Sequence, residues 1–579
     1  MLTEDLPRDW WKGVVVYQVY PRSFADSDGD GVGDIRGVIE RLGHLERLGV
    51  DVLWLSPVYC SPQDDNGYDI SDYRGIDPLF GTLEDVDELI ARAHDAGIRL
   101  VMDLVVNHTS DEHAWFVDSR SSRDSEHRDW YWWRPPRKGH VGGEAGAEPN
   151  NWGSFFSGSA WEWDEATGEY YLHLFSRKQP DLVWSNPDVR AAVYAMMRWW
   201  LARGVDGFRM DVINLIDKPD GLPDGDKKLG DLWGQAFPLV STGPRVHDYL
   251  QEMHGQVFAD LGRPYLTVGE MPGVDAEQAR LFTDPARREV DMVFQFEHVD
   301  LDKGPSGKFD IVPLTMAELR ANLMRWQVEL DDVGWNSLYW DNHDQPRAVS
   351  RFGDDDPVWR ERSAKTLGTV LHTLRGTPYV YQGEELGMTN VPFSAPEDFR
   401  DIESVNYIRE QTAAGVPFSD LLPGLRFRSR DNARTPVQWT AGEHAGFTRG
   451  EPWIPVTPNH EEINAEAQVG VEGSVFEHYR ALVALRHEER AVSHGTVTPL
   501  AMDHPDLWAF GREHEGTRLL VLASFTREPV EVPPELLEGW EGAEAVVATS
   551  GDAAAGVLTH GVLPGWESVV LRSSGTLAE

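Results

Sequence analysis

Eight short apolar runs, each followed by polar or helix-forming residues, set the rhythm of this 579-residue chain. Strand-like runs that alternate with amphipathic helical stretches are typical of a parallel α/β sheet. Eight such strands with interleaved helices match the count of a closed (β/α)8 barrel, the TIM barrel. The expected strands are Val14–Tyr20, Val50–Ser56, Ile98–Val106, 205–212, Pro264–Glu270, Asp291–Glu297, Asn336–Trp340 and Thr377–Gln382.

Two stretches break this rhythm and predict further parts of the fold. Residues 109–175 are rich in Trp, Gly, Ser and Arg without regular periodicity, which indicates a subdomain inserted after the third strand. Over residues 495–579 short runs separated by turn residues predict a C-terminal antiparallel β-domain, a β-sandwich. The barrel would then comprise residues 1–108 and 176–494, with residues 388–470 as a long loop-like region after the eighth strand.

The charge balance excludes several classes of partner. There are 53 basic against 96 acidic residues, a formal net charge of −43, which argues against binding nucleic acid or an anionic membrane.

No apolar run approaches the ~20 residues that span a bilayer, and the first residues lack the features of a signal peptide. Cys60 is the only cysteine, so no internal disulfide can form. We therefore expect a cytoplasmic protein, a monomer or a weak homo-oligomer.

The segment 205–213, Val-Asp-Gly-Phe-Arg-Met-Asp-Val-Ile, is the strand with the most chemistry. Side chains alternate across a strand, so Arg209 and Asp211 share one face while Phe208 and Met210 share the other. An apolar face packed outward and a charged face turned inward suit a strand of an active site. The same Arg–Asp pair taken alone is more often a structural ion pair.

In such barrels the active site lies at the C-terminal ends of the strands. Any one polar residue at a strand end can be a helix cap or a loop residue, but their recurrence at consistent positions predicts one shared site. The residues at these ends are Asp69, His108, Arg209, Asp211, Glu270, His343 and Asp344.

Two of these carboxylates have the properties that glycoside hydrolysis needs, one ionised and one protonated. Asp211 lies beside Arg209, so we expect it to keep a low pKa and to stay anionic, as a nucleophile requires. Glu270 follows an apolar run, and burial there would raise its pKa and favour a general acid. The sequence has no Ser-His-Asp elbow motif, Walker loop or Cys/His metal spacing that competes with this interpretation.

Four ordered segments resemble the signature regions of the alpha-amylase family, glycoside hydrolase family 13: Asp103-Leu-Val-Val-Asn-His108, Gly207-Phe-Arg-Met-Asp211, Gly269-Glu270 and Asp341-Asn-His-Asp344. Three further segments look like the oligo-1,6-glucosidase branch: Gln179-Pro-Asp-Leu182, 382–390 and 429–436. The branch usually has Asn after the first of these, where this chain has Val183. The similarity runs from about residue 10 to about residue 490.

The resemblance implies a retaining double displacement. Asp211 would be the nucleophile, Glu270 the acid and base, and Asp344 the residue that binds the sugar hydroxyls. Tyr68 would offer a stacking face to the non-reducing glucose. The pocket around that glucose would be lined by Tyr68, Asp69, His108, Phe175, Arg209, His343 and Arg430, with Arg434 close to Arg430 in the same motif.

The residue after the nucleophile, Val212, bears on linkage. In related enzymes Val at this position goes with α-1,6 linkages and Thr with α-1,4 linkages, a change of polarity without a change of shape. We therefore expect an exo-acting α-glucosidase that releases terminal α-1,6-linked glucose from short oligosaccharides such as isomaltose, without an organic cofactor.

Three other functions stay open. An α-1,4-preferring or sucrose-acting α-glucosidase would share the mechanism and differ in specificity. A trehalose-6-phosphate hydrolase would need a basic cluster for the phosphate, and none is obvious in so acidic a chain. A catalytically silent amylase-like binding protein would typically lose catalytic acids and carry a membrane anchor, whereas this chain keeps Asp211, Glu270 and Asp344.

The loop Asp26-Ser-Asp-Gly-Asp-Gly-Val-Gly-Asp34 spaces acidic oxygens like the start of a calcium loop. An EF-hand would need Glu at the twelfth position, which here is Gly37, so the loop is not an EF-hand. The same loop in similar glucosidases holds a structural cation, Ca²⁺ or Mg²⁺. The resemblance implies these ligands: Asp26, Asp28, Asp30, Asp34 and the carbonyl of Val32.

Overall fold

The computed structural model describes residues 6–228 and 232–574. Its centre is a ring of eight parallel strands in the order β11-β10-β9-β5-β2-β1-β15-β14. A parallel bridge between Val293 and Asn336 joins the two ends of this order, so the sheet closes into the predicted barrel. The strands are β1 (Val16–Val19), β2 (Val52–Leu55), β5 (Arg99–Val105), β9 (Gly207–Asp211), β10 (Leu266–Glu270), β11 (Met292–Phe294), β14 (Ser337–Leu338) and β15 (Thr377–Tyr381).

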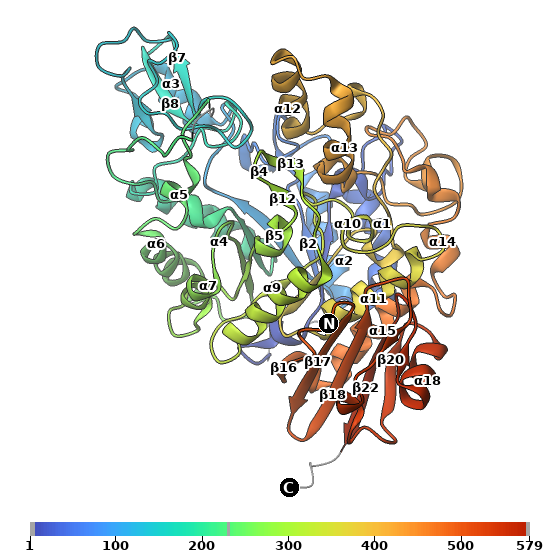
Figure 1. The fold of residues 1–579 in the computed structure, drawn as a ribbon. Helices are drawn as coiled ribbons and strands as arrows, with labels where there is room; N and C mark the ends of the chain where they lie inside the picture. Colours follow the sequence, from blue (N-terminus) through green and yellow to red (C-terminus); the bar gives the residue numbers. More distant parts are fainter. Residues whose placement is uncertain (1–5, 229–231, 575–579) are drawn as a thin grey trace.

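Helices surround the barrel (Figure 1), and local signals set where they begin and end. Helix α1 begins at Ile35 because the side chain of Asp34 accepts the N–H of Gly37, and it ends where Gly49 turns left-handed with φ 89°. A capping box at Thr82 starts α2 in the same way. The helices are α1 (Ile35–Leu48), α2 (Leu83–Asp95), α4 (Pro187–Arg203), α6 (Val246–Met253), α7 (Ala276–Thr283), α9 (Met316–Glu329), α11 (Arg360–Thr373) and α15 (Val475–Glu488).

The two faces of strand β9 point in opposite directions, as the sequence predicts. Phe208 and Met210 are buried in the apolar layer between the strands and the outer helices. Apolar side chains from the other strands, such as Val101 and Val268, belong to a second buried cluster. Because the period of a strand is two, Arg209 and Asp211 share the face of β9 opposite Phe208 and Met210.

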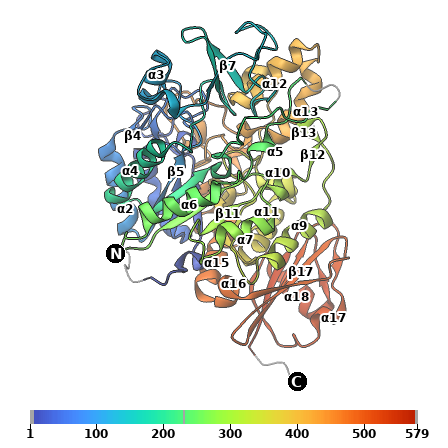
Figure 2. The ribbon, with the colours of Figure 1, turned by 90° about the vertical axis from the view of Figure 1, so that its left-hand side faces the viewer.

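The insertion between β5 and α4 has its own small sheet, in the order β6-β8-β7, and the helix α3 (Ala114–Ser121). Its aromatic residues make a local core in which Phe116 stacks on Trp133, with ring centroids 5.7 Å apart. Figures 1 and 2 show this part at the top of the molecule. The strands are β6 (Trp133–Arg134), β7 (Trp161–Asp164) and β8 (Glu169–Leu172).

The stretch 388–470 differs from the loop-like region that the sequence predicts. It contains the helices α12 (Ile402–Ala413) and α13 (Phe418–Arg428), whose apolar side chains share a small core that includes Ile408 and Leu425. Weak periodicity, Pro423 inside α13 and the Pro- and Gly-rich flanks conceal these helices in the sequence. Helix α13 lies beside the strand hairpin β12 (Lys303–Gly304) and β13 (Gly307–Ile311), and Tyr407 of α12 contacts Phe309 of β13 with ring centroids 4.6 Å apart.

The C-terminal part is a five-stranded antiparallel sheet in the order β16-β17-β18-β22-β20, at the bottom of Figure 1. One face packs on the barrel through Trp508 and Val521. The other face, with Leu520, is covered by helix α18 (Gly551–His560) and the short β19–β21 ladder. The antiparallel sheet is therefore as predicted, but a helix and a two-stranded ladder stand where a β-sandwich would have its second sheet. The strands are β16 (Thr496–Leu500), β17 (Leu507–His514), β18 (Thr517–Ser524), β19 (Val530–Glu531), β20 (Glu544–Ala548), β21 (Val562–Leu563) and β22 (Ser568–Ser574).

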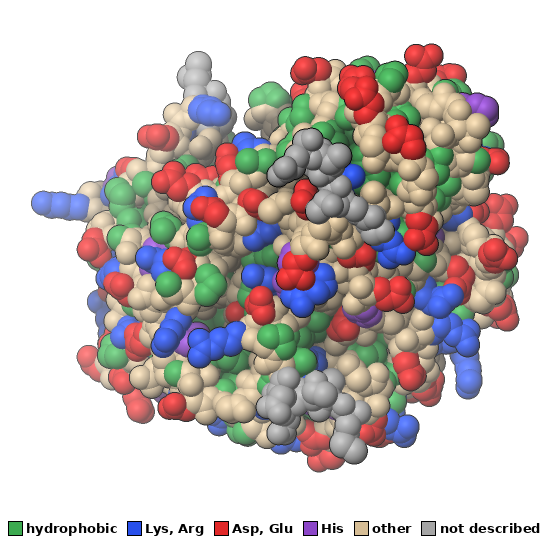
Figure 3. Space-filling model, turned by 90° about the horizontal axis from the view of Figure 1, so that it is seen from below, with side chains coloured by type: hydrophobic (Ala, Val, Ile, Leu, Met, Phe, Trp, Pro, Cys, Tyr) green, Lys and Arg blue, Asp and Glu red, His purple; other side chains and the backbone are tan. Residues whose placement is uncertain are grey.

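The surface reflects the acidic composition. Figure 3 shows the molecule from below, with Asp and Glu side chains spread over the face and Lys and Arg between them. Among residues 6–228 and 232–574, no helix combines the length and the apolar character needed to cross a membrane. The ends of the predicted barrel and C-terminal segments, residues 1–5 and 575–579, lie outside the described residues.

Candidate active site

A cavity of about 830 Å³ opens at the C-terminal ends of the barrel strands. Asp211 and Glu270 are the last residues of β9 and β10, and Asp344 follows β14. All three line the cavity and are brought together by the barrel from positions far apart in the sequence. Cavities at this end of such barrels are where their active sites lie.

The buried guanidinium of Arg209 binds three carboxylates at once. Its Nη1 lies 2.7 Å from both Asp103 Oδ1 and Asp211 Oδ1, and its Nη2 lies 2.7 Å from Glu270 Oε1. The register explains the arrangement, because Asp103 on β5 and Val268 on β10 both lie opposite Arg209. The Arg–Asp pair that the sequence suggests is therefore part of a four-residue cluster, in which Asp211 and Glu270 share one cation.

The two carboxyl groups titrate differently. Burial raises the pKa of Glu270 to about 8, against the opposing charge of Arg209. Burial also raises the pKa of Asp211, to about 6. The expectation of a low pKa for Asp211 is wrong, because the cost of burying its charge exceeds the stabilisation by an arginine that two other carboxylates share. The expected order is kept, with Asp211 the stronger acid.

Asp344 is the most acidic of the three predicted catalytic carboxyl groups. Burial opposes its ionisation, but the interactions with His343 and with the guanidinium groups of Arg430 and Arg434 outweigh this and hold its pKa well below the usual range. Its Oδ1 lies 3.2 Å from Arg430 Nη1 and 2.9 Å from Arg434 Nη2. Of the two arginines that share one motif, Arg430 lines the cavity. Arg434 is buried behind the cavity wall and contacts Asp344 from there.

Val212 has an unusual backbone. The strand ends at Asp211, and Val212 turns left-handed with φ 34° and ψ 41°, a region that β-branched residues rarely adopt. Its N–H donates to Glu270 Oε2 at 3.0 Å, and its side chain lines the cavity. The sequence prediction placed Val212 inside the strand, where such a turn could not be foreseen.

Aromatic rings form part of the wall of the cavity. Tyr68 stacks on His343, with ring centroids 5.1 Å apart and an interplanar angle of 4°. His108 and Phe175 are in ring contact at 5.1 Å. Arg209 and His343 lie behind the cavity surface and support residues that face it. The predicted residues that line the cavity are Tyr68, His108, Phe175, Asp211, Val212, Glu270, Asp344 and Arg430.

Asp69, which the sequence predicts in the wall of the cavity, does not line it. Asp65 lines the cavity instead. The carboxylate of Asp69 is buried and accepts hydrogen bonds from Ser61 Oγ and from the N–H groups of Asp64 and Asp65. It therefore shapes the loop. Asp65 lines the cavity, and its Oδ1 lies 3.2 Å from Arg430 Nη2.

A buried lysine that the sequence analysis missed joins two of the motifs. Lys218 is fully buried, and its Nζ lies 2.6 Å from Asp181 Oδ2 and 2.6 Å from Asn107 Oδ1. Asn107, which directly precedes His108 in the chain, also donates an N–H of its side-chain amide to Asp181 Oδ2 at 3.1 Å. A lone Lys beyond a strand gives no signal in a sequence, although both of its partners stand in motifs.

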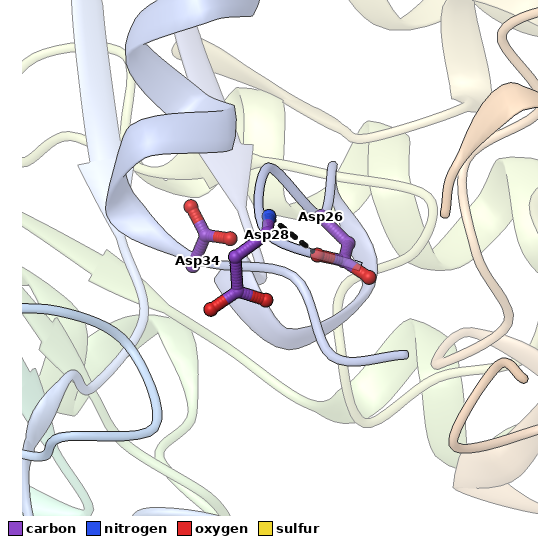
Figure 4. A group of neighbouring side chains, drawn as sticks. All are labelled: Asp26, Asp28 and Asp34. Atoms are coloured by element: carbon purple, nitrogen blue, oxygen red, sulfur yellow. Dashed lines mark hydrogen bonds between the residues drawn. The ribbon is translucent and has the colours of Figure 1, made fainter. Parts of the chain in front are cut away.

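The acidic loop before α1 brings three predicted metal ligands together (Figure 4). Single carboxylate oxygens of Asp26, Asp28 and Asp34 all lie within 4.8 Å of one another. Asp30 is outside this group and accepts the N–H of Val32 at 2.8 Å. Clustered carboxylate oxygens are the donors that hard divalent cations prefer, so the donor set fits the expected ion.

A (β/α)8 barrel that holds two adjacent and differently titrating carboxyl groups in a cavity has the site of a glycoside hydrolase. Known proteins agree, since the family model described as the alpha amylase catalytic domain matches residues 18–495. The chain therefore belongs to the alpha-amylase family and is a glycoside hydrolase.

Individual relatives cover nearly the whole chain. It is 55% identical to an oligo-1,6-glucosidase of Halalkalibacterium halodurans, over 89% of this chain and 90% of that protein. It is 46% identical to a trehalose-6-phosphate hydrolase of Bacillus subtilis, over 99% of both. The crystal structure of an isomaltulose synthase from a Klebsiella species is 41% identical, with a TM-score of 0.91 over 97% of this chain and 99% of that chain.

Proposed function

We propose that this protein is a retaining, exo-acting α-glucosidase that hydrolyses terminal α-1,6-linked glucose from short isomalto-oligosaccharides. The observation that carries the retaining mechanism is the shared guanidinium, whose two terminal nitrogens each hold one carboxyl group, that of Asp211 and that of Glu270. This arrangement favours the separation of about 5–5.5 Å found in retaining enzymes over the wider ~6.5–9.5 Å of inverting ones.

The two carboxyl groups then divide the chemistry. The Asp211 carboxylate attacks the anomeric carbon while the Glu270 carboxyl gives its proton to the departing glycosidic oxygen, which leaves a covalent glucosyl ester on Asp211. The Glu270 carboxylate next takes a proton from water, which attacks the same carbon and frees Asp211. The N–H of Val212, 3.0 Å from Glu270 Oε2, holds that carboxyl group during both steps.

Two features support the exo action and the linkage. The ion pair between Asp65 and Arg430 is part of the cavity wall and offers hydrogen bonds to the hydroxyls of one terminal sugar. The apolar side chain of Val212 lines the same cavity and gives no hydroxyl to the scissile region. Relatives at about half identity bear the name oligo-1,6-glucosidase, which agrees with this preference.

A trehalose-6-phosphate hydrolase is the second candidate, because Lys303 and Lys308 of the β12–β13 hairpin line the cavity. Lys308 is paired with Glu403, Nζ to Oε2 at 2.6 Å, which offsets its charge. Arg428 and Arg430 line the cavity as well, so four basic side chains face seven carboxyl groups there, among them Asp300 and Glu410. This surplus of acidic groups disfavours a phosphate, and we expect Lys303→Ala to leave hydrolysis of isomaltose unchanged.

We also propose a structural Ca²⁺ or Mg²⁺ in the acidic loop. Asp26, Asp28 and Asp34 would supply carboxylate oxygens, and Asp30 and the Val32 carbonyl would complete the ligands as the family resemblance implies. Asp26 also accepts a hydrogen bond from Thr448, more than 400 residues away. The ion would therefore brace the start of α1 against the segment around Thr448, which follows α13, and it would take no part in the reaction.

The remaining expectations concern the setting of the enzyme. We propose a cytoplasmic protein that acts on small oligosaccharides as a monomer or a weak homo-oligomer, since a single partly exposed cysteine gives no basis for disulfides. Size-exclusion chromatography with light scattering at several concentrations would measure the oligomeric state.

The mechanism and the exo action can be tested together by NMR of the products. Isomaltotriose should yield glucose and isomaltose as the first products, and the new glucose should appear first as the α-anomer. Initial release of the β-anomer would contradict the retaining mechanism. Internal cleavage of longer isomalto-oligosaccharides would contradict the exo action.

A further inference from the structure

Helix α12 turns one face toward the cavity. Glu403 and Glu410 of this helix line the cavity, and Asn406 lies between them at a spacing that places all three on one side. The amide of Asn406 donates to the carbonyl of Phe156 at 3.0 Å. Phe156 belongs to the inserted subdomain, so this hydrogen bond joins two parts of the chain that are 250 residues apart. Both stand at the top of Figures 1 and 2.

The ring of Phe156 contacts two residues that line the cavity. Its centroid lies 5.0 Å from the guanidinium carbon of Arg430 and 5.5 Å from the ring of Phe175. Phe175 in turn contacts His108. A shift of Phe156 would therefore disturb the cavity wall on the side of Arg430 and on the side of His108.

The loop 153–158 is held partly by its own hydrogen bonds, since the N–H of Ser154 donates to the Gly158 carbonyl at 3.0 Å and the N–H of Phe156 donates to Ser154 Oγ at 3.1 Å. Ser157 and Gly158 are both left-handed, with φ 76° and 84°, which makes a tight turn directly after Phe156. The base of the loop is held by the N–H of Phe155, which donates to the Leu174 carbonyl at 2.8 Å. Asn406 holds the tip from the opposite side of the site.

Helix α12 is itself a fixed support. Glu403 pairs with Lys308 of the β12–β13 hairpin, and Ser404 Oγ donates to Asp431 Oδ2 at 2.9 Å. Asp401, just before the helix, pairs with Arg430 and Arg434. A side chain on this helix can therefore fix a neighbouring loop with little movement of its own.

We infer that Asn406 is a positioning residue for substrate binding, which holds Phe156 over Arg430 and so fixes the loop 153–158 as a wall of the cavity. This rests on the proposed α-glucosidase function. Asn406 touches neither Asp211 nor Glu270, so it acts on how tightly the terminal glucose is held and leaves the chemical step unchanged. Loss of its hydrogen bond raises KM and preserves kcat.

The test uses Asn406→Asp, which keeps the size of the side chain but removes the N–H donor, together with Asn406→Ala. Val405→Ala is the matched control, because Val405 is the neighbouring residue on α12 and is 42% exposed. Asn406→Asp keeps the oxygen that accepts from Arg409 Nη2 at 2.7 Å, whereas Asn406→Ala also loses this exposed hydrogen bond. We expect KM for isomaltose to rise about 3–10-fold in both Asn406 variants, the size of the lost hydrogen bond to Phe156, with kcat within about twofold. Hydrogen exchange at residues 153–158 should accelerate in both, and Val405→Ala should match the wild type.

Two results would overturn the inference. One is an unchanged KM with unchanged exchange in both Asn406 variants. The other is a joint loss of kcat and thermal stability, which would indicate a merely structural role. Hydrogen exchange is measured without substrate, so it decides the inference even if the wild-type enzyme does not hydrolyse isomaltose. That last outcome would reject the proposed function instead.

Discussion

Arg209 and Glu270 are in direct contact, Nη2 to Oε1 at 2.7 Å, although burial raises the pKa of Glu270 to about 8. The contact places the guanidinium against a carboxyl group that is protonated at neutral pH. Asp211, on the other nitrogen of the same guanidinium, ionises about two pH units lower. One arginine thus holds an acid and a base side by side.

The first prediction is a bell-shaped pH dependence of kcat/KM. Activity should rise through about pH 6 as Asp211 ionises and fall through about pH 8 as Glu270 loses its proton. The two groups interact, so the limbs report the pair and not separate residues. Initial rates from pH 4 to 10 would measure the profile.

The variant Glu270→Gln tests whether Glu270 causes the fall of kcat/KM at high pH. With an aryl glucoside that needs no proton to depart, Glu270→Gln should still form the glucosyl enzyme but lose the fall at high pH. An alkaline limb that persists in this variant would show that another group causes it.

The second prediction concerns the buried pair of Lys218 and Asp181. Lys218→Met would leave a buried carboxylate without its cation, and we expect the free energy of unfolding to fall by about 3–5 kcal/mol. Urea denaturation would measure this. Lys178→Met is the control, because Lys178 pairs with Asp111 near the surface and should cost less than about 1 kcal/mol. Equal losses in the two variants would contradict the importance of the buried pair.

The third prediction concerns linkage. Val212→Thr keeps the β-branched shape, so the left-handed backbone is equally strained, and it adds one hydroxyl to the cavity wall. The ratio of kcat/KM for isomaltose to that for maltose should fall about 10-fold or more. A ratio that stays constant while both activities persist would move the origin of the linkage preference to other residues.

The fourth prediction concerns the proposed cation. After treatment with EDTA, added Ca²⁺ or Mg²⁺ should raise the melting temperature of the wild type, since a ligand at 100 times its Kd stabilises by about 2.7 kcal/mol. Asp28→Ala should remove this response, because it deletes one of the three clustered carboxylates. Asp28 is chosen since it is the exposed member of the cluster and does not cap α1, so the substitution should not disturb the helix. An equal response in the variant would place the ion elsewhere.

The sequence predicts the barrel well because each strand is a buried apolar run with a polar end. This pattern also locates Asp211, Glu270 and Asp344. The helices α12 and α13 escape such a prediction because Pro423 and weak periodicity conceal them. Asn406, which lies on α12, could not be connected with Phe156 for the same reason.

The remaining errors in the site have a different origin. The loop 61–69 has several Asp residues within a few positions, and only folding decides that Asp69 binds backbone N–H groups while Asp65 faces Arg430. The pKa of Asp211 depends on how many carboxylates share Arg209. The number of carboxylates around Arg209 follows from the register of β5, β9 and β10, and a single sequence does not give this register.

The most direct test of the proposed function compares initial rates of glucose release from isomaltose, maltose, sucrose and trehalose 6-phosphate, with Asp211→Asn as the blank. We expect the highest kcat/KM on isomaltose, and a loss of at least about 10³-fold in the variant. A higher kcat/KM on one of the other three substrates would contradict the proposed specificity. Activity that survives in Asp211→Asn would contradict the nucleophile.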